Sequence, residues 1–261
     1  MARIVAVANQ KGGVGKTTTT INLAASLALA DRRVLLIDVD PQANLTSGVG
    51  QKGKASAAGT VYAALTSREP TTDARPFIIP TVVDRLQLIP ADRNLTGAEI
   101  EMVTLSGREE RLRSLIASVR GDFDYIYIDC PPSLGLMTLN ALVAADAVLI
   151  PLHCEYFALE GLADLVGTIR RVRAALNPAL DIEGVLLTMF DERTNLGQQV
   201  ATDVRQFFKE KVFRTVIPRN VRLGEAPSHG LPVILYDVKS RGSEAYIALA
   251  REVLERSASA A

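Results

Sequence analysis

Short apolar runs alternate with longer stretches of helical periodicity along most of the 261-residue chain. The runs are rich in Val, Ile and Leu without a polar face, which predicts strands of a buried parallel sheet. The predicted strands cover residues 4–8, 34–38, 86–89, 125–129, 147–151, 184–189 and 216–218. Helices are predicted over residues 16–30, 109–119, 136–145, 159–176, 196–208 and 244–255.

This alternation predicts an α/β fold, with a single doubly wound, mostly parallel sheet flanked by helices and joined by right-handed crossovers. No Pro/Ser-rich linker interrupts the pattern, so we expect one domain over residues 1–256 and a disordered tail over 257–261. The polar stretch 49–76 reads as a loop with a short helix near 61–65. Ligands of such sheets bind at the carboxyl ends of the strands.

The first predicted strand ends in a glycine-rich turn, NQKGGVGKTTTT, that leads into a helix. Glycines let successive backbone N–H groups point at one anion, and the helix adds its positive N-terminal end. This order of strand, loop and helix predicts a phosphate-binding loop, whereas a plain connecting turn leaves Lys16 and Thr17 unexplained. The candidate nucleotide contacts are Lys11, Gly12, Gly13, Val14, Gly15, Lys16, Thr17 and Thr18. Two departures from the ordinary pattern are the extra Lys11 and a glutamine, Gln10, in place of glycine.

Acidic residues end two later strands, where a magnesium ion beside the phosphates needs oxygen ligands. Asp129 is the candidate metal-binding acid, although the Pro-Pro-Ser that follows also allows a helix cap or turn role. Asp38 and Asp40, two residues apart, lie on one face of an extended segment, so both carboxylates can face the phosphates. The alternative is that they only stabilise a turn before the proline. We expect Asp38 to support Thr17 and the ion, and Asp40 to orient the attacking water. The predicted metal residues are therefore Thr17, Asp38 and Asp129.

The charge balance and the cysteine content bear on whether the protein binds nucleic acid and on where it is located. The 29 basic and 29 acidic residues balance, so any contact with nucleic acid must come from a local patch. Six basic residues and one acid fall between Arg205 and Arg222, which indicates either such a patch or a solvated helix face. Two cysteines do not suggest a disulfide scaffold, so a cytoplasmic location is the default. We expect no signal peptide and no membrane-spanning segment.

Four segments together resemble the deviant Walker A ATPases, and among them the ParA/Soj chromosome-partitioning family. They are the loop, the segment DVDPQ at 38–42, DCPPS at 129–133, and VIPRNVRLGEAPS at 216–228. The last run is the most discriminating, and Gln10 also favours this group. The resemblance extends from residue 4 to about 254 and is weakest over 49–76.

The resemblance implies an ATP- and Mg²⁺-dependent ATPase with slow intrinsic turnover that works as a DNA-partitioning switch. Lys11 is implied to reach across an ATP-bound homodimer to the partner's phosphates, and Lys16 to neutralise the phosphates in its own subunit. With Asp40, these are the predicted catalytic residues. Pro218 and Asn220 are implied to line the adenine pocket.

The resemblance also implies partners. Arg193 and Arg222 match arginines that contact double-stranded DNA without sequence preference, and a ParB-type centromere-binding protein is implied to stimulate hydrolysis. The protein is then nucleoid-associated in the cytoplasm.

Three other functions fit the same fold. A MinD-like, membrane-cycling regulator of cell division needs a basic amphipathic C-terminal helix, and this chain's end is short of apolar and basic residues. An iron–sulfur ATPase needs interface cysteines, which Cys130 and Cys154 do not resemble. A metabolic ligase has no substrate motif here to support it.

Overall fold

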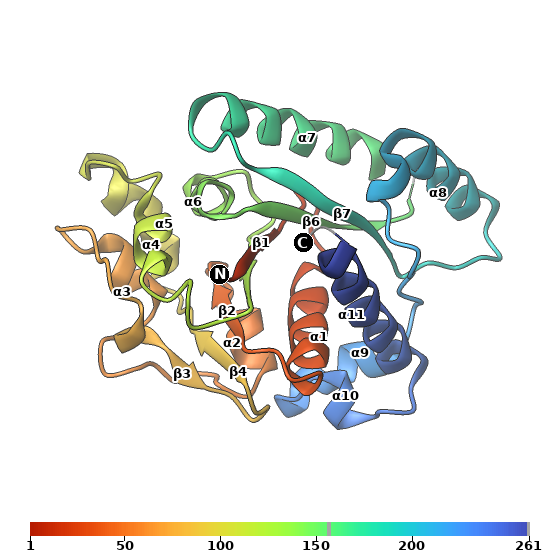
Figure 1. Ribbon diagram of the computed structural model, residues 1–261, viewed down its shortest axis with the longest axis horizontal. Coiled ribbons are helices and arrows are strands. Elements are labelled where there is room, and N and C mark those ends of the chain that lie inside the picture. The colour runs from red at the N-terminus through yellow and green to blue at the C-terminus, as the bar shows by residue number, and fades with distance from the viewer. Residues whose placement is uncertain (156–157, 260–261) are drawn as a thin grey trace.

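A seven-stranded sheet in the order β3-β4-β2-β5-β1-β6-β7 runs through the centre of the computed structural model, which describes residues 1–155 and 158–259 (Figure 1). Only the pairing of β3 with β4 is antiparallel among the named strands of this described part. The strands are β1 Arg3–Val7, β2 Val34–Asp38, β3 Ile79–Pro80, β4 Leu86–Ile89, β5 Tyr125–Asp129, β6 Ala147–His153 and β7 Asp181–Thr188.

Helices cover both faces of the sheet, as a doubly wound fold requires. The α-helices are α1 Lys16–Leu29, α2 Asn44–Gly48, α3 Val61–Thr66, α4 Leu95–Glu101, α5 Arg111–Ala117, α6 Leu136–Ala144, α7 Ala158–Ala175, α8 Asn195–Phe208, α9 Val221–Glu225, α10 Val233–Tyr236 and α11 Arg241–Ser259. The short 3₁₀ segments are η1 Arg75–Phe77, η2 Met102–Thr104, η3 Lys209–Lys211 and η4 Ala226–His229.

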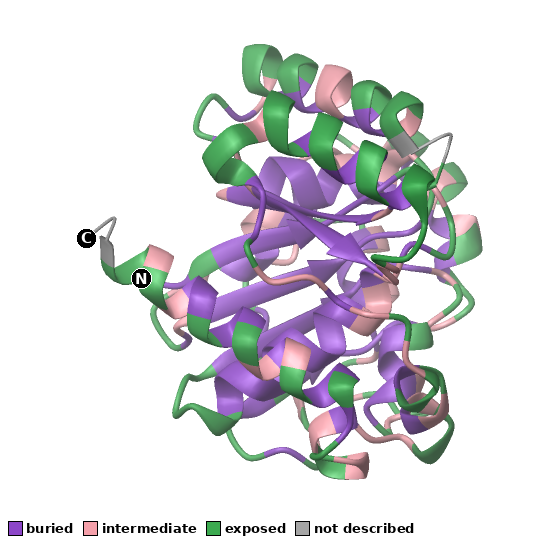
Figure 2. Ribbon diagram, turned by 90° about the vertical axis from the view of Figure 1, so that its right-hand side faces the viewer, coloured by how far each residue is buried: buried purple, intermediate pink, exposed green. Residues whose placement is uncertain are grey.

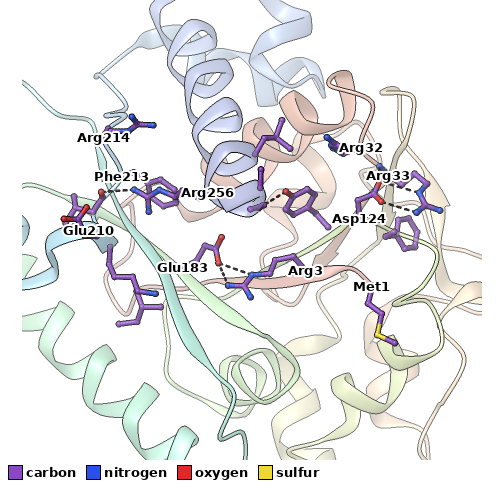
Figure 3. A pocket seen from close by; sticks show the side chains of 18 of the residues that line it. Met1, Arg3, Arg32, Arg33, Asp124, Glu183, Glu210, Phe213, Arg214 and Arg256 are labelled. Carbon is purple, nitrogen blue, oxygen red and sulfur yellow. Dashed lines mark hydrogen bonds and ion pairs between the residues drawn. The ribbon is translucent and has the colours of Figure 1, made fainter. Parts of the chain in front are cut away.

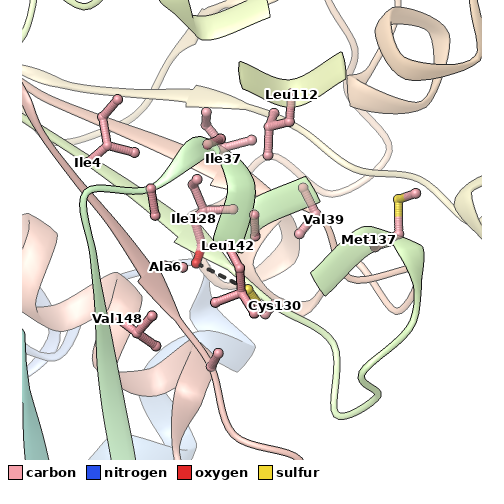
Figure 4. Close-up of a cluster of buried hydrophobic side chains, with 14 of the residues drawn as sticks. Ile4, Ala6, Ile37, Val39, Leu112, Ile128, Cys130, Met137, Leu142 and Val148 are labelled. Carbon is pink, nitrogen blue, oxygen red and sulfur yellow. Dashed lines mark hydrogen bonds between the residues drawn. The ribbon is translucent and has the colours of Figure 1, made fainter. Parts of the chain in front are cut away.

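Alternate residues of each strand feed two separate hydrophobic cores. Along β1, Ile4 and Ala6 pack in the core under α3–α8, while Val5 and Val7 pack in the core under α1 and α9–α11. The first of these cores includes Cys130, which follows β5 (Figure 4). Figure 2 shows buried strands between helices whose outer sides are exposed. The predicted fold class is therefore confirmed.

The predicted strand over residues 216–218 is wrong. Here Pro218 makes only an isolated bridge to Phe190, beside β7. Ile217 donates its N–H to Leu187 and accepts one from Phe190, but proline has no N–H with which to continue the pairing. The apolar pattern also does not predict β3 and the short helices α2, α4, α9 and α10, because elements of two to seven residues have too little periodicity.

The disordered tail predicted over 257–261 is wrong for residues 257–259, because α11 continues to Ser259. The hydroxyl groups of Ser257 and Tyr125 lie 3.1 Å apart, which ties this last turn to the start of β5. Residues 260–261 lie outside the described residues. The helix is also held by the buried Glu252, whose carboxylate accepts the backbone N–H groups of Arg214 and Thr215.

The C-terminus of α6 is capped by Asn177, whose amide nitrogen donates to the carbonyls of Leu142, Val143 and Ala145. We expect Asn177→Asp to lower the free energy of unfolding by about 2–4 kcal/mol, because it aims carboxylate oxygens at three buried carbonyls. Denaturant unfolding measures this effect. The exposed Asn94→Asp, as a matched control, should change stability by less than about 0.5 kcal/mol. Equal stability of the two variants would contradict the capping role.

Candidate nucleotide-binding site

The carboxyl ends of three neighbouring strands bring the predicted site residues together. In the sheet, β5 lies between β2 and β1, and its last residue, Asp129, pairs in register with Asp38 on one side and Val7 on the other. Val7 leads directly into the glycine loop. The order of the strands therefore places the two acids beside the loop, as the sequence predicts.

The loop has the backbone shape that phosphate binding requires. Gly13 and Gly15 have φ values of 71° and 87°, in the left-handed region where a side chain is strained. Gly15 precedes the first turn of α1, whose N–H groups face the mouth of the loop. The Thr188 hydroxyl at the end of β7 donates to the Val14 carbonyl at 2.8 Å, so an edge strand supports the loop from behind.

Lys16 lies inside the loop, 7% exposed. Its ammonium group donates to the Lys11 carbonyl at 3.1 Å and so spans the loop. Burial lowers the pKa of Lys16, and the nearby Asp129 and Asp40 oppose that shift. Because Lys16 is already largely desolvated in the folded protein, it would lose little further hydration on pairing with the β- and γ-phosphates of a nucleotide.

The two strand-end acids have different partners. Asp129 accepts the hydroxyls of Thr17 at 2.7 Å and Thr20 at 3.1 Å. Asp38 instead accepts hydrogen bonds from the hydroxyl and the backbone N–H of Thr46. The contact expected between Asp38 and Thr17 is therefore replaced by one between Asp38 and Thr46. Both carboxyls are fully buried and adjacent, and burial raises the pKa of each.

The donor set suits magnesium shared with phosphate. Thr17, Asp38 and Asp129 offer hard oxygen atoms, and a divalent cation would offset the cost of two buried carboxylates. Within residues 1–155 and 158–259, no group of three or more His, Cys, Asp or Glu side chains could hold a metal by itself. The site therefore fits an ion whose remaining ligands are phosphate oxygens and water.

Lys11 is turned out of its own loop. Its ammonium group lies 2.6 Å from a Glu155 carboxylate oxygen, and the other oxygen of Glu155 lies 3.0 Å from Nδ1 of His153. The Asn9 side chain holds the Lys11 backbone in place: its oxygen accepts the Lys11 N–H, and its NH₂ group donates to the Pro151 carbonyl. The Lys11 side chain is 36% exposed at the mouth of the site.

Asp40 and the two candidate adenine residues lie on loops around the same edge. Asp40 is 7% exposed, and its carboxylate accepts the backbone N–H of Gln42 at 2.9 Å. Pro218 follows the short pairing with β7, and Asn220 caps α9 by accepting the backbone N–H of Arg222. The oxygen of Asn220 is thus used by the protein, and its NH₂ group is the part suited to contact a base.

The basic run from Arg205 to Arg222 does not form one patch. Arg222, on α9, contacts Glu225 at 2.7 Å and Asp237 at 3.3 Å. Arg193 follows β7, at the carboxyl edge, with an 89% exposed side chain that pairs with Asp191. Four members of the run line a groove near the amino ends of the strands instead: Arg205, Lys209, Lys211 and Arg214.

That groove, of about 1420 Å³, is distinct from the phosphate loop (Figure 3). Apart from Arg3 on β1, its basic residues lie near the C-terminal ends of helices α1, α8 and α11, whose partial negative charge attracts cations. Several are already neutralised: Arg3 pairs with Glu183 at 2.6 Å, and Arg33 with Asp124 at 3.1 Å. Helix C-terminal ends and ion pairs therefore account for much of the basic charge in this groove.

Three supporting residues were missed in the sequence: Thr20, Thr46 and Thr188. Thr20 lies one helical turn after Thr17, a spacing that places both hydroxyls on the Asp129 side of α1. The contacts of Thr46 and Thr188 join segments far apart along the chain. Their roles depend on tertiary structure and leave no local signal.

The doubly wound sheet, the glycine loop with Lys16 and Thr17, and the two strand-end acids define a P-loop nucleotide-binding protein. A family model described as an AAA domain matches residues 2–182. The chain is 56% identical to the chromosome partitioning protein ParA of Myxococcus xanthus, covering 98% of this chain and 89% of that protein. It is also 56% identical to the sporulation initiation inhibitor protein Soj of Bacillus subtilis, covering 97% and 98%. The chain belongs to the ParA/Soj family of chromosome-partitioning ATPases.

Solved structures agree with this fold. Cobyrinic acid a,c-diamide synthase from Mycobacterium smegmatis, with bound ADP and magnesium, is 37% identical with a TM-score of 0.85, covering 100% of this chain and 97% of that one. The cell division ATPase MinD of Pyrococcus furiosus is 26% identical with a TM-score of 0.79, covering 98% and 99%.

Proposed function

We propose that this protein is an ATP-dependent DNA-partitioning switch. ATP joins two chains in a sandwich dimer, the dimer binds DNA without sequence preference, and a ParB-type partner stimulates hydrolysis and release. The observation that carries the proposal is Lys11, whose side chain is 36% exposed and whose ammonium group pairs with Glu155, outside the phosphate loop. A lysine in that position suits the phosphates of a facing chain better than those of its own.

Each site residue has a defined task in hydrolysis. Lys16 neutralises the β- and γ-phosphates, and the loop N–H groups hold them. Thr17, Asp38 and Asp129 are the residues that would hold Mg²⁺, which supplies positive charge to the phosphate oxygens. Asp40 orients the attacking water, and slow intrinsic turnover follows if Lys11 must arrive from another chain. The bound ADP and magnesium of the Mycobacterium smegmatis neighbour support these cofactors.

DNA binding is assigned to Arg193 and Arg222. Both guanidinium groups pair with exposed or half-exposed carboxylates, and such pairs contribute only about 0–1 kcal/mol. Phosphates of a DNA backbone can therefore replace the carboxylates. A dimer doubles these contacts, so affinity depends on ATP and falls steeply with salt. Such a protein acts in the cytoplasm, on the nucleoid.

We expect ATP, but not ADP, to produce salt-sensitive binding to arbitrary duplex DNA. Arg193→Glu and Arg222→Glu should each weaken that binding by about 10-fold or more, since each replaces a phosphate contact with a repulsive charge. Fluorescence anisotropy with two unrelated duplexes measures the effect, alongside nucleotide affinity, which should not change. Arg32→Glu, in the groove at the opposite edge, is the matched control. Equal DNA affinity with ATP and ADP would overturn the switch.

A MinD-like membrane cycle is the alternative. Among the described residues, no helix combines the length and apolar character needed to cross a bilayer. The apolar face of α11, including Tyr246, Leu249 and Val253, is buried in the protein core and not available to lipid. This packing favours DNA over membrane as the partner. ATP-dependent sedimentation with anionic vesicles, in the absence of DNA binding, would reverse the choice.

Two further functions have less support. Cys130 and Cys154 are buried, and burial raises the pKa of both thiols, which disfavours the thiolates that an iron–sulfur cluster needs. The Mycobacterium smegmatis neighbour named as a synthase is 37% identical to this chain, whereas the partitioning relatives are 56% identical. The higher identity favours partitioning over a synthase activity.

A further inference from the structure

Thr46, on the short helix α2, is only 1% exposed, and its hydroxyl and backbone N–H together make three hydrogen bonds. Its hydroxyl and its backbone N–H both donate to Oδ2 of Asp38, at 2.7 and 2.9 Å. The same hydroxyl accepts the backbone N–H of Ala91 at 3.0 Å. A buried hydroxyl that donates and accepts in this way has one fixed orientation.

These bonds join the ends of two adjacent strands. Asp38 ends β2, and Ala91 lies two residues beyond β4, its neighbour in the sheet. The other oxygen of Asp38, Oδ1, accepts the backbone N–H of Asp40 at 3.1 Å. Both oxygens of Asp38 are therefore aimed by protein donors, and two of the three donors belong to Thr46.

The same contacts hold the loop that carries Asp40. Residues 39–45 leave β2 and return to Asp38 through Thr46, so one carboxylate anchors both ends. Within the loop, Ala43 has a φ of 50°, a left-handed conformation that costs a non-glycine residue about 1–2 kcal/mol. Such a conformation persists only where the surrounding contacts enforce it. Asp40 lies in the constrained segment and accepts the Gln42 N–H.

We infer that Thr46 is a positioning residue for the reaction: it aims Asp38 at the magnesium site and sets the loop that places Asp40. The inference rests on the proposed Mg²⁺-dependent hydrolysis of ATP. The phosphate loop is not attached to Thr46, so nucleotide affinity depends little on it. Outer-sphere partners of this kind typically change metal affinity or activity by about 10–100-fold.

The experiment compares Thr46→Val, which keeps the shape and removes the hydroxyl, with Thr46→Ser, which keeps the hydroxyl. For Thr46→Val we expect about 10–100-fold lower kcat, about 10-fold more Mg²⁺ for half-maximal rate, and KM for ATP within about 3-fold. Thr46→Ser should recover both kcat and the Mg²⁺ midpoint to within about 3-fold. The gain in Tm that Mg²⁺ adds to ADP, read by calorimetry without turnover, should shrink for Thr46→Val alone. Thr202→Val, which removes an exposed hydroxyl on α8, is the matched control.

A wild-type Mg²⁺ midpoint and kcat in Thr46→Val would overturn the inference. Equal impairment of Thr46→Val and Thr46→Ser would do the same, because it would assign the effect to packing. Should Thr46→Val fail to fold, Thr46→Ala replaces it in the comparison with Thr46→Ser. Absence of Mg²⁺-dependent hydrolysis in the unmodified protein would instead overturn the proposed function.

Discussion

Asp129→Asn should abolish Mg²⁺-dependent ATP hydrolysis and at the same time make the protein more stable. The acids Asp129 and Asp40 lie near one buried cation, Lys16, and the carboxyls of Asp38 and Asp129 are fully buried side by side. Burying these carboxyls lowers the free energy of unfolding, and the site keeps them because its function needs them. Asparagine removes the charge. Its single oxygen accepts the hydroxyl of one threonine, and its NH₂ group donates to the hydroxyl oxygen of the other.

We expect hydrolysis to fall by about 100-fold or more, on the scale of losing one preorganised charge-stabilising group. We expect stability in the absence of nucleotide to rise by about 1–2 kcal/mol, or roughly 2–8 °C in Tm. Calorimetry and a phosphate-release assay measure the two effects. Asp84→Asn removes an acid whose side chain is 97% exposed, and it should change neither. A lower Tm for Asp129→Asn, or hydrolysis that keeps its rate, would contradict the assignment.

A one-to-one mixture of Lys11→Ala and Asp40→Ala chains should hydrolyse ATP although each variant alone is inactive. In a two-fold sandwich dimer, each nucleotide meets the Asp40 of one chain and the Lys11 of the other. A mixed dimer therefore has one complete site, supplied by both chains. Random pairing makes half of the dimers mixed, so the mixture should reach about a quarter of the wild-type rate.

The control mixture replaces the Asp40→Ala chain with a chain that carries both substitutions, and it should stay inactive. Light scattering verifies that dimers form in each mixture. Dimers without recovered activity would mean that Lys11 serves the phosphates of its own chain. In that case its ammonium group must leave Glu155 and turn toward its own loop.

The phosphate loop and both strand-end acids could be predicted from the sequence because their positions follow from local rules. A buried apolar run fixes where a strand ends, and the carboxyl ends of parallel strands share one edge. Asp38 and Asp129 lie 91 positions apart yet pair in register for that reason. Their individual partners could not be predicted, since the choice between Thr17 and Thr46 depends on how α1 and α2 pack.

The basic run from Arg205 to Arg222 shows a different limit of prediction from sequence. A single patch would require residues close in sequence to be close in space, but from Arg205 to Arg222 the chain passes from the end of α8 to α9, across the side of β7. Arg214 and Arg222 thus reach opposite ends of the strands. A count of charges along the sequence has no information about such a crossing, whereas the resemblance to the ParA/Soj family identified Arg193 and Arg222 separately.

The hydrogen bond between Thr188 and the Val14 carbonyl links the phosphate loop to the carboxyl end of β7. Arg193 follows Thr188 by five residues, so even a fully extended chain places it no more than about 18 Å from the strand end that supports the phosphate loop. Arg193 and the phosphate loop are thus tethered to the same end of β7. Because the Thr188 hydroxyl binds the Val14 carbonyl directly, a single hydrogen bond separates the phosphate loop from the base of this tether.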